Sequence, residues 1–455
     1  MYKRYEQYKP SDCDWFDDIP LHWNVKKFSK FTKYINRGST PEYSPKGIMV
    51  INQATFSKGI WDISDVRYTS ARLEGNKGRV EKDDVLIAST GGGILGKVYY
   101  FYEDGEYIAD SHVTIIRANE FTNAKFLYYT LKPKYEIINA VLAKGSTNQT
   151  ELQKQWLKDF LIPAPRKKEQ EQIVRFLDWK TKEISHYVKE KRKELNKLGE
   201  LKNSLIFEAV TKGINRNLET KDSSIGWIGK IPKHWEEIML FQCTSEQKYS
   251  NKLVHHQNLL SLSYGKIVSK DINTTEGLLP ASFDTYQVIQ DGNIILRLTD
   301  LQNDHRSLRV GIATQEGIIT SAYTCLKTRK NVLPMFLYLM LHSYDVSKVF
   351  YGLGGGVRQS IGFADIRRII IPLPSIEEQK TIVEFCIQKK EEIENKINNI
   401  QNEVKLFEEL RNKLISDAVT GKIDVRNIRI PEYQIESEET DTETEENNEI
   451  EDYKD

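Results

Sequence analysis

Cysteine is scarce in this sequence, and long hydrophobic runs are missing. The 455 residues contain no Cys-x-x-Cys pair and no histidine at ligand spacing from a cysteine. The cysteines are Cys13, Cys243, Cys325 and Cys386. This pattern favours reduced thiols over a disulfide framework or a metal site. The longest apolar stretch, near Val332–Leu341, is about half of a membrane span, and no apolar secretory segment opens the chain. We therefore expect a cytoplasmic protein with no metal and no membrane contact.

Catalytic signatures are missing as well. No Ser/His/Asp or Cys/His set, no Asn/Asp-Pro-Pro-aromatic methyltransferase tetrapeptide and no clear Pro-Asp…Glu-x-Lys nuclease cluster is present. Gly91–Lys97 matches the first part of a phosphate-binding loop, but Val98 stands where Ser or Thr would bind Mg²⁺, and a strand-like run follows. A nucleotide loop, a glycine hairpin that approaches DNA phosphate and a plain turn are the alternatives. We expect no catalytic residues in this chain.

The formal net charge of zero hides an uneven distribution. Residues 432–455 contain twelve acidic side chains and one lysine, so they carry −11 and the remainder carries +11. A basic body fits a polyanionic partner, although the excess is modest. The acidic segment is too polar to pack and is expected to be disordered. It either discourages non-specific DNA contact or simply solubilises the chain.

An internal repeat is the most informative feature, since segments of the first half return 209 to 212 residues later. The paired segments are Ile19–Trp23 with Ile231–Trp235, Ile162–Pro165 with Ile371–Pro374, Glu169-Gln170 with Glu378-Gln379, Ile173-Val174 with Ile382-Val383, and Ala209–Thr211 with Ala418–Thr420. Residues 29–120 and 241–330 show no obvious likeness. Each half is thus a variable block followed by a constant block, as in a protein that reads two targets, although plain gene duplication is the alternative. His22 and His234 recur in matched Pro-x-His-Trp contexts, which favours packing over catalysis.

Each constant block follows a Pro-x-Pro sequence and predicts one long helix of about 45 residues, roughly 65–70 Å in length. Gly213 and Gly421 are plausible C-terminal stops. Apolar residues recur at three- and four-residue steps and form one stripe on each helix. The expected helix-pairing residues are Ile173, Leu177, Ile184, Leu195, Leu198, Leu205, Ile382, Ile393, Ile397, Val404, Phe407 and Leu414.

The two stripes are each other's obvious partners, and duplicated halves commonly relate by a pseudo-two-fold axis, which makes the pair antiparallel. The alternative is that each helix docks on its own globule. The variable blocks mix short strand-like runs with a helix near 124–141 in the first and near 335–349 in the second. The expected strands are Val85–Ala88, Lys97–Tyr102, Val113–Ile116, Asn293–Leu296, Val310–Ala313 and Thr324–Lys327. We therefore predict an α+β fold, with two globular domains separated by two long, antiparallel, coiled-coil-like helices.

Side chains that can read bases gather in a few places. Arg pairs well with guanine, and Asn and Gln pair well with adenine, in the major groove. Arg297–Arg309 is rich in such groups, although each could equally be ordinary surface. The candidate DNA-binding residues are Asn52, Gln53, Ser89, Lys97, Asn148, Gln149, Arg297, Gln302, Asn303, Arg306, Arg309, Arg358 and Gln359.

With these motifs in order and present twice, the sequence resembles the specificity subunits of type I restriction–modification systems. The Ile-Pro-x-His-Trp, Ile-Pro-x-Pro and Ala-Val-Thr motifs carry the resemblance, with Arg297–Arg309 and Gly317–Tyr323 in support. It implies two target-recognition domains, a bipartite double-stranded DNA site, two methyltransferase subunits and two motor–nuclease subunits. S-adenosylmethionine, ATP and Mg²⁺ are then cofactors of those partners and not of this chain.

On this interpretation the chain divides into five parts. These are a first target-recognition domain (1–165), a central helix (166–214), a second target-recognition domain (215–374), a distal helix (375–423) and an acidic tail (424–455). The alternatives are a specificity subunit of a modification-only complex, a coiled-coil scaffold without a DNA role, and a nucleotide hydrolase built on Gly91–Lys97. The resemblance transfers no catalytic or base-contact residue.

Overall fold

The computed structural model describes residues 2–144, 150–253, 256–272, 282–301, 304, 307–353 and 361–431. It divides into two compact units. Unit 1 comprises Met1–Arg192 and Asn402–Asp455, and unit 2 comprises Lys193–Gln401. The two long helices, α5 (Lys167–Lys212) and α9 (Ile376–Val419), each contribute to both units. The boundary between the units therefore falls within both long helices, so that each unit contains a part of α5 and a part of α9.

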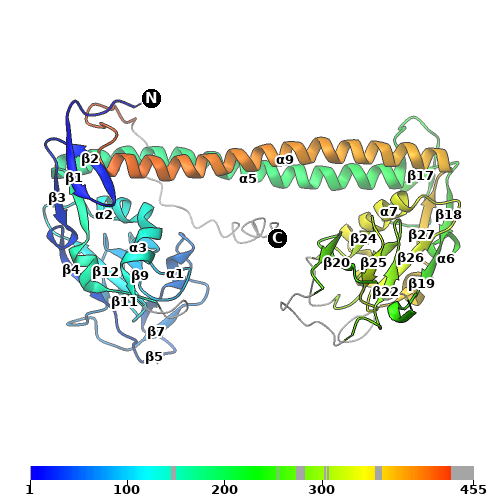
Figure 1. The fold of residues 1–455 in the computed structure, drawn as a ribbon, viewed down its shortest axis with the longest axis horizontal. Helices are drawn as coiled ribbons and strands as arrows, with labels where there is room; N and C mark the ends of the chain where they lie inside the picture. The colour runs from blue at the N-terminus through cyan, green and yellow to red at the C-terminus, as the bar shows by residue number, and fades with distance from the viewer. Residues whose placement is uncertain are drawn as a thin grey trace. The chain divides into compact units, whose positions relative to one another are not determined.

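Unit 1 contains fifteen of the strands named among the described residues (Figure 1). The strands are β1 (Tyr8–Cys13), β2 (Phe16–Pro20), β3 (Asn24–Lys27), β4 (Thr32–Arg37), β5 (Tyr43–Ser44), β6 (Ile48–Ile51), β7 (Arg67–Thr69), β8 (Arg79–Val80), β9 (Val85–Ala88), β10 (Val98–Tyr100), β11 (Tyr107–Ala109), β12 (Val113–Ala118), β13 (Ala143–Lys144), β14 (Glu151–Leu152) and β15 (Leu161–Ala164). The short helices are η1 (Phe28–Lys30), α1 (Ala54–Ser57), α2 (Ala124–Leu131), η2 (Lys132–Lys134), α3 (Tyr135–Val141) and α4 (Lys154–Asp159).

Three layers build the globule of unit 1. A four-stranded antiparallel sheet, β10-β9-β12-β4, lies between the helices and a five-stranded mixed sheet, β5-β7-β6-β11-β8. The strand β9 explains this order, because its apolar residues alternate between the two faces. Val85 and Ile87 pack with Leu127 of α2, whereas Leu86 packs on the opposite face with Ile51 of the second sheet. A strand covered on both faces reads as one continuous apolar run.

Unit 2 contains the remaining named strands. They are β16 (Thr220–Asp222), β17 (Lys230–Pro232), β18 (Glu236–Met239), β19 (Thr244–Gln247), β20 (Leu259–Ser263), β21 (Lys266–Lys270), β22 (Gln287–Ile289), β23 (Ile294–Leu296), β24 (Val310–Ile312), β25 (Gly317–Ile319), β26 (Thr324–Thr328) and β27 (Ile370–Leu373). The short helices are α6 (Leu240–Cys243), η3 (Asn251–Leu253), α7 (Pro334–Val346), η4 (Val349–Gly352) and α8 (Phe363–Ile366).

The two globules share one topology. The sheet β24-β23-β26-β19 of unit 2 repeats β10-β9-β12-β4 of unit 1 strand for strand. In the second sheets, the parallel pair β20–β25 repeats the parallel pair β6–β11, and each pair has an antiparallel neighbour on both sides. Helix α7 covers its sheet as α2 does. The variable blocks are therefore duplicated in fold, although their sequences show no obvious likeness.

The long helices lie antiparallel within each unit. In unit 1 the rings of Tyr187 and Phe407 lie 4.3 Å apart, and Arg192 forms an ion pair with Glu408 at 3.0 Å. In unit 2 Lys202 forms an ion pair with Glu394 at 3.4 Å. All twelve expected helix-pairing residues are buried or half-buried. The ends of the stripes also serve the globules, since Ile382 joins the core of unit 2 with α7. The antiparallel pairing of the two long helices is confirmed, whereas the assignment of these twelve residues to the pairing surface stays a prediction. At the helix ends, docking on the globule also occurs.

The predicted strands and helix ends lie where the sequence places them, with one exception among the helices. The six expected strands correspond to β9, β10, β12, β23, β24 and β26. Gly213 and Gly421 adopt φ of +74° and +77°, as left-handed helix stops do. The single helix expected near 124–141 is wrong, because a 3₁₀ turn that contains Pro133 separates α2 from α3.

The acidic tail begins later than expected. Val425 is fully buried, Asp424 N donates to Lys3 O at 2.9 Å, and Gln172 Nε2 donates to the carbonyls of Val425 and Ile428 at 3.0 Å. Residues 424–431 therefore pack on unit 1, and the remaining tail lies outside the described residues. Within the described part of the chain, no helix is long and apolar enough to span a membrane.

Candidate nucleic-acid interface

The two motifs that the sequence singles out occupy the same place in the duplicated fold. Gly91–Lys97 lies in the loop between β9 and β10, and Arg297–Arg309 forms the loop between β23 and β24. The backbone bond from Ala88 N to Lys97 O, 2.9 Å long, has its counterpart in the bond from Arg297 N to Arg309 O, also 2.9 Å. Lys97 and Arg309 are therefore topologically equivalent residues. We call the stretch 89–97 the glycine loop and the described residues of the stretch 297–309, namely 297–301, 304 and 307–309, the arginine loop.

The glycine loop is held from one side by α3. Tyr135 donates its hydroxyl to Gly93 O at 2.6 Å, and Asn139 Nδ2 donates to Leu95 O at 2.7 Å. Gly96 has φ +89°, and a Cβ there would lie 2.9 Å from Ile138 Cγ2, so a side chain does not fit. The strand β10 follows at once, where a nucleotide-binding loop requires a helix. The geometry is that of a glycine hairpin whose open side carries the exposed Lys97.

Polar side chains from neighbouring elements meet beside the glycine loop. Thr90 Oγ1 lies 2.7 Å from His112 Nδ1 and donates to Gln53 Oε1 at 3.4 Å. Gln53 Nε2 would contact a Cβ on Gly91 at 3.8 Å, so the predicted residue Gln53 does lie next to the loop. Asn52 is adjacent, but its Oδ1 accepts from Thr55 N at 3.1 Å, in the first turn of α1.

Sequence reasoning missed His112 and Arg37 at this place. His112 is exposed, and Arg37 donates to Ser111 O and forms an ion pair with Glu151 at 3.3 Å. These residues sit at the ends of β12 and β4 and come near Thr90 only through sheet pairing. An isolated His or Arg at a strand end gives no signal in one sequence.

Two predicted contacts must be corrected, because their side chains are completely buried. Ser89 has no exposed surface, and its hydroxyl lies 2.6 Å from Thr114 Oγ1 and donates to Ile87 O at 3.2 Å. Arg309 is also fully buried, and its donors bond to carbonyls of its own loop and to the hydroxyl of Tyr351. Neither side chain has surface to offer to a DNA base.

Arg297 and Lys97 remain candidate DNA contacts, because the side chain of Lys97 is exposed and that of Arg297 is partly exposed. The Arg297 side chain is 32% exposed, and its Nη2 lies 3.8 Å from the carboxylate of Asp304. The other predicted contacts, Asn148, Gln149, Gln302, Asn303, Arg306, Arg358 and Gln359, lie outside the described residues.

The repeated motifs assemble into one junction per unit, where a long helix begins. In unit 1 His22 Nε2 lies 3.0 Å from Glu169, which also accepts from Tyr5 at 2.7 Å. In unit 2 His234 Nε2 lies 2.8 Å from Glu378. The histidines thus tie the Pro-x-His-Trp turn to the first turn of α5 or α9, which agrees with a packing role.

The adjacent glutamine fixes the same helix to the globule. Gln170 accepts from Asn123 N at 2.9 Å and donates to Pro165 O at 3.0 Å. Gln379 repeats this by accepting from Leu333 N at 2.8 Å and donating to Pro374 O at 3.0 Å. The Glu-Gln pair therefore sets the direction in which each helix leaves its globule.

Each junction also receives the end of the other helix. Gly421, after α9, packs so closely on Pro20 that a Cβ would lie 2.4 Å from its Cδ. Gly213, after α5, packs on Trp235 and lies near Glu378. The Ala-Val-Thr motif and the Pro-x-His-Trp motif thus meet within each unit, which explains why both recur.

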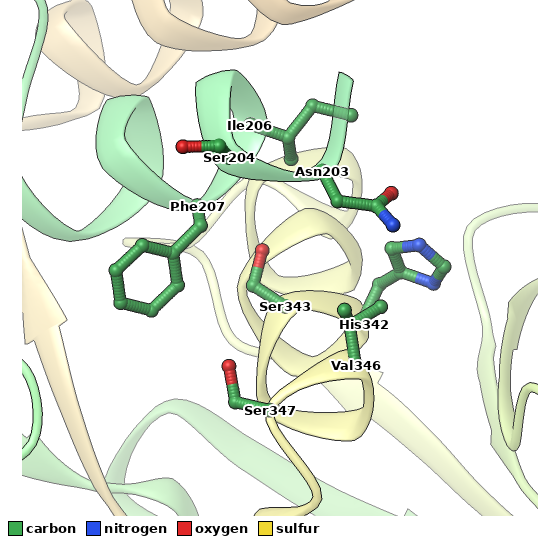
Figure 2. A pocket seen from close by; sticks show the side chains of 8 residues that line it. All are labelled: Asn203, Ser204, Ile206, Phe207, His342, Ser343, Val346 and Ser347. Atoms are coloured by element: carbon green, nitrogen blue, oxygen red, sulfur yellow. The ribbon is translucent and has the colours of Figure 1, made fainter. Parts of the chain in front are cut away.

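A small hollow lies between α5 and α7 in unit 2, with a volume of about 170 Å³. Figure 2 shows the Asn203 amide pointing toward the ring of His342, with Phe207 on the other side. Burial, together with Lys390 and Lys202, lowers the pKa of His342 to about 4, so the ring is neutral at pH 7. Its Nδ1 has no hydrogen-bond partner among the described residues.

Comparisons with known proteins agree with this architecture. A family model described as "Type I restriction modification DNA specificity domain" matches residues 20–197 and 289–404, which is more than half of the chain. The putative type I restriction enzyme MjaX specificity subunit of Methanocaldococcus jannaschii is 25% identical over 429 residues, covering 90% of this chain and 95% of the relative. The MjaVIII specificity subunit of the same organism is 24% identical over 433 residues, with the same coverage.

The fold itself also has a solved counterpart. A chain from a structure of the type I R-M system, described in terms of complex assembly and conformational transition, aligns with a TM-score of 0.67 at 14% identity. The alignment covers 89% of this chain and 99% of that one. With the repeated motifs, the family match and the shared fold together, this chain belongs to the specificity subunits of type I restriction–modification systems.

Proposed function

We propose that this chain reads a bipartite DNA site, with each half-site read by the globule of one unit. The observation that carries this proposal is the equivalence of the glycine loop and the arginine loop. They occupy one position in one duplicated topology, and yet they differ in length and chemistry. A duplicated reader that serves two different targets requires a common frame with unlike contact loops.

In this proposal the loops and their neighbours enter the major groove. Lys97 supplies a phosphate contact and Arg297 a base contact, and Gln53 supplies an amide that can pair with adenine. The glycine loop lets the backbone approach the DNA closely, because its glycines place no side chain in the way. Phosphate contacts give salt-dependent affinity without sequence choice, and base-edge contacts give the choice.

The helix pair would hold the two readers and dock the partners. Leu201 on α5 and Leu410 on α9 are 47% and 49% exposed, and they are equivalent in the repeat, 209 residues apart. Two equivalent apolar sites suit two copies of one partner, the methyltransferase subunit. Two motor–nuclease subunits would complete the assembly in the cytoplasm.

The chemistry of the complex would belong to these partners. S-adenosylmethionine would supply the methyl group for adenine methylation, and ATP with Mg²⁺ would drive the motor. This chain would bind, orient and space the DNA, and it would carry no catalytic residue.

The test is to co-produce the chain with its methyltransferase partner and to map methylated adenines in the genomic DNA. We expect one motif with two short defined halves and an undefined spacer of fixed length. A single continuous motif would contradict the two-reader proposal. The absence of methylation, together with no DNA binding by the assembled complex, would favour a scaffold without a DNA role.

A further inference from the structure

The arginine loop is built around a buried cation. Arg309 is fully buried, and its five guanidinium protons point to five acceptors inside the loop and beside it. Nε donates to Tyr351 at 3.0 Å, and Nη1 donates to the carbonyls of Thr299 at 2.7 Å and Arg297 at 3.3 Å. Nη2 donates to the carbonyl of Asp300 at 3.3 Å and to that of Asp304. The guanidinium thus provides hydrogen-bond donors for backbone carbonyls of the loop, which lie outside the paired strands.

The neighbours of Arg309 reinforce this shape. The Asp304 carboxylate lies 3.7 Å from Arg309 Nη2 and 3.8 Å from Arg297 Nη2, so one anion joins the buried and the partly exposed arginine. Asp345 of α7 accepts a hydrogen bond from the backbone N of Arg309. Leu298 and Leu301 are buried in the core of unit 2 and anchor the first half of the loop. The partly exposed Arg297 is therefore placed through contacts that lead back to Arg309.

The equivalent residue of unit 1 has a different role. Lys97 is exposed at the end of the glycine loop, which α3 holds from outside. The arginine loop is longer in sequence. Ordering a longer loop costs more conformational entropy, and the internal hydrogen bonds of Arg309 offset this cost. Lysine cannot replace Arg309, because its ammonium has three donors at one point and cannot reach four carbonyls and a hydroxyl at once.

We propose that Arg309 is a positioning residue that determines the DNA half-site read by unit 2, by fixing the arginine loop from within and without touching DNA. This inference rests on the proposed function, because it assumes that the loop reads DNA. The buried side chain of Arg309 then determines which DNA sequence is chosen, because it positions Arg297, which makes the contact with DNA.

Three variants of the full chain, each co-produced with the methyltransferase partner, test the proposal. Arg309→Lys keeps the charge and loses the fork, Tyr351→Phe removes one acceptor and keeps the ring, and Lys97→Ala is the control at the equivalent exposed position. The readouts are the methylation motif, enrichment from a random-sequence duplex library, and the salt dependence of binding to the enriched duplex. Thermal unfolding verifies that each variant is folded.

We expect Arg309→Lys to lose or change one half of the motif, with at least about tenfold less methylation at the parental site, while the other half is unchanged. Tyr351→Phe should show the same change to a smaller extent. The slope of log K against log salt should stay at the parental value in both variants, whereas Lys97→Ala should lower it by about one phosphate contact and leave the motif intact.

The inference is overturned if Arg309→Lys and Tyr351→Phe both keep the parental motif, or if the salt slope falls in Arg309→Lys, which would mark a direct phosphate contact. Should Arg309→Lys not fold, Tyr351→Phe decides alone, and a parental motif there counts against the proposal. A parental protein that shows no bipartite motif refutes the proposed function, and this outcome is distinct from a parental motif that survives both substitutions.

Discussion

Glu378 accepts a hydrogen bond from the indole Nε1 of Trp235 at 3.1 Å, and this bond ties the start of α9 to the core of unit 2. In unit 1, among the described residues, the matching Trp23 Nε1 has no partner, and Glu169 bonds the hydroxyl of Tyr5 instead. The repeat therefore preserves the glutamate and changes the group that it satisfies. Both carboxylates stand at a helix N-terminus, where the helix dipole favours negative charge.

Glu378→Ala should destabilise unit 2 by about 1–3 kcal/mol, because it leaves the Trp235 indole, which is 1% exposed, without an acceptor. The exposed ion pair with His234 should add little. The measurement is the urea unfolding midpoint, with Glu377→Ala in the same helical turn as an exposed control. Equal midpoints for the two variants would show that the junction bond does not stabilise the unit.

A second prediction concerns pH and the hollow beside α7. His342 has a folded pKa of about 4, below its ordinary value of 6.5, so the unfolded chain binds more protons between these values. Stability contributed by the neutral ring is complete above pH 6.5 and is lost as pH falls toward 4, by up to about 3 kcal/mol. His342→Gln removes this loss, so the variant should gain stability relative to the parent as pH falls.

The readout for His342 must be the difference between variant and parent. Burial raises the pKa of Asp345 to about 6, and this group acts in the opposite direction, because its contribution is lost as pH rises through 6. Both proteins contain Asp345, so its effect cancels in the difference between their unfolding midpoints. A difference that stays constant from pH 7 to pH 4 would mean that His342 is not buried as described.

The exposed leucines of the long helices give a third prediction. Leu201→Glu and Leu410→Glu should leave folding intact, because both side chains are about half exposed. Each should remove one methyltransferase copy from the complex, and the double variant should remove both. Native mass spectrometry counts the copies, and Glu171→Lys on the exposed surface of α5 is the charge-change control. A full complement in the double variant would place the docking surface elsewhere.

The long helices were predictable because their signals are local. Apolar spacing, the Pro-x-Pro sequence before each helix and a glycine after it all report the conformation of neighbouring residues. The repeated motifs were also visible, since the Pro-x-His-Trp and Glu-Gln segments recur at offsets of 212 and 209 residues. The ion pairs of His22 with Glu169 and of His234 with Glu378 were not predictable from this recurrence. The shared fold of the variable blocks was not visible in the sequence. A sheet keeps its topology when only its alternating apolar positions are retained, and Val98 and Val310, at the start of equivalent strands, are such positions.

The candidate contacts were harder to predict, because burial of a polar residue depends on distant segments. Arg309 looks like a surface arginine in sequence, yet Tyr351 and the loop carbonyls surround it. Ser89 is covered in the same way by Thr114 of the neighbouring strand. Gln53 was predicted and lies beside the glycine loop, whereas His112 reaches Thr90 only through the pairing of β9 with β12.

The fourth prediction tests the helices as the element that sets the spacer. Deleting Lys193–Gly199 from α5 and Asn395–Gln401 from α9 removes seven residues from each helix at facing positions of the antiparallel pair. Seven residues are nearly two whole turns, so both apolar stripes keep their direction within about 20°. Each helix shortens by about 10 Å, which equals the rise of about three base pairs.

The methylation motif of this double deletion should keep both halves and lose about three base pairs from its spacer. Deleting two residues from each helix instead turns the distal stripe by about 200°, so that the apolar side chains no longer face each other, and should prevent stable pairing. Adenine mapping of the parent and both variants is the measurement. A seven-residue deletion that still methylates the parental motif with its original spacer would show that the helices do not set the distance between the half-sites.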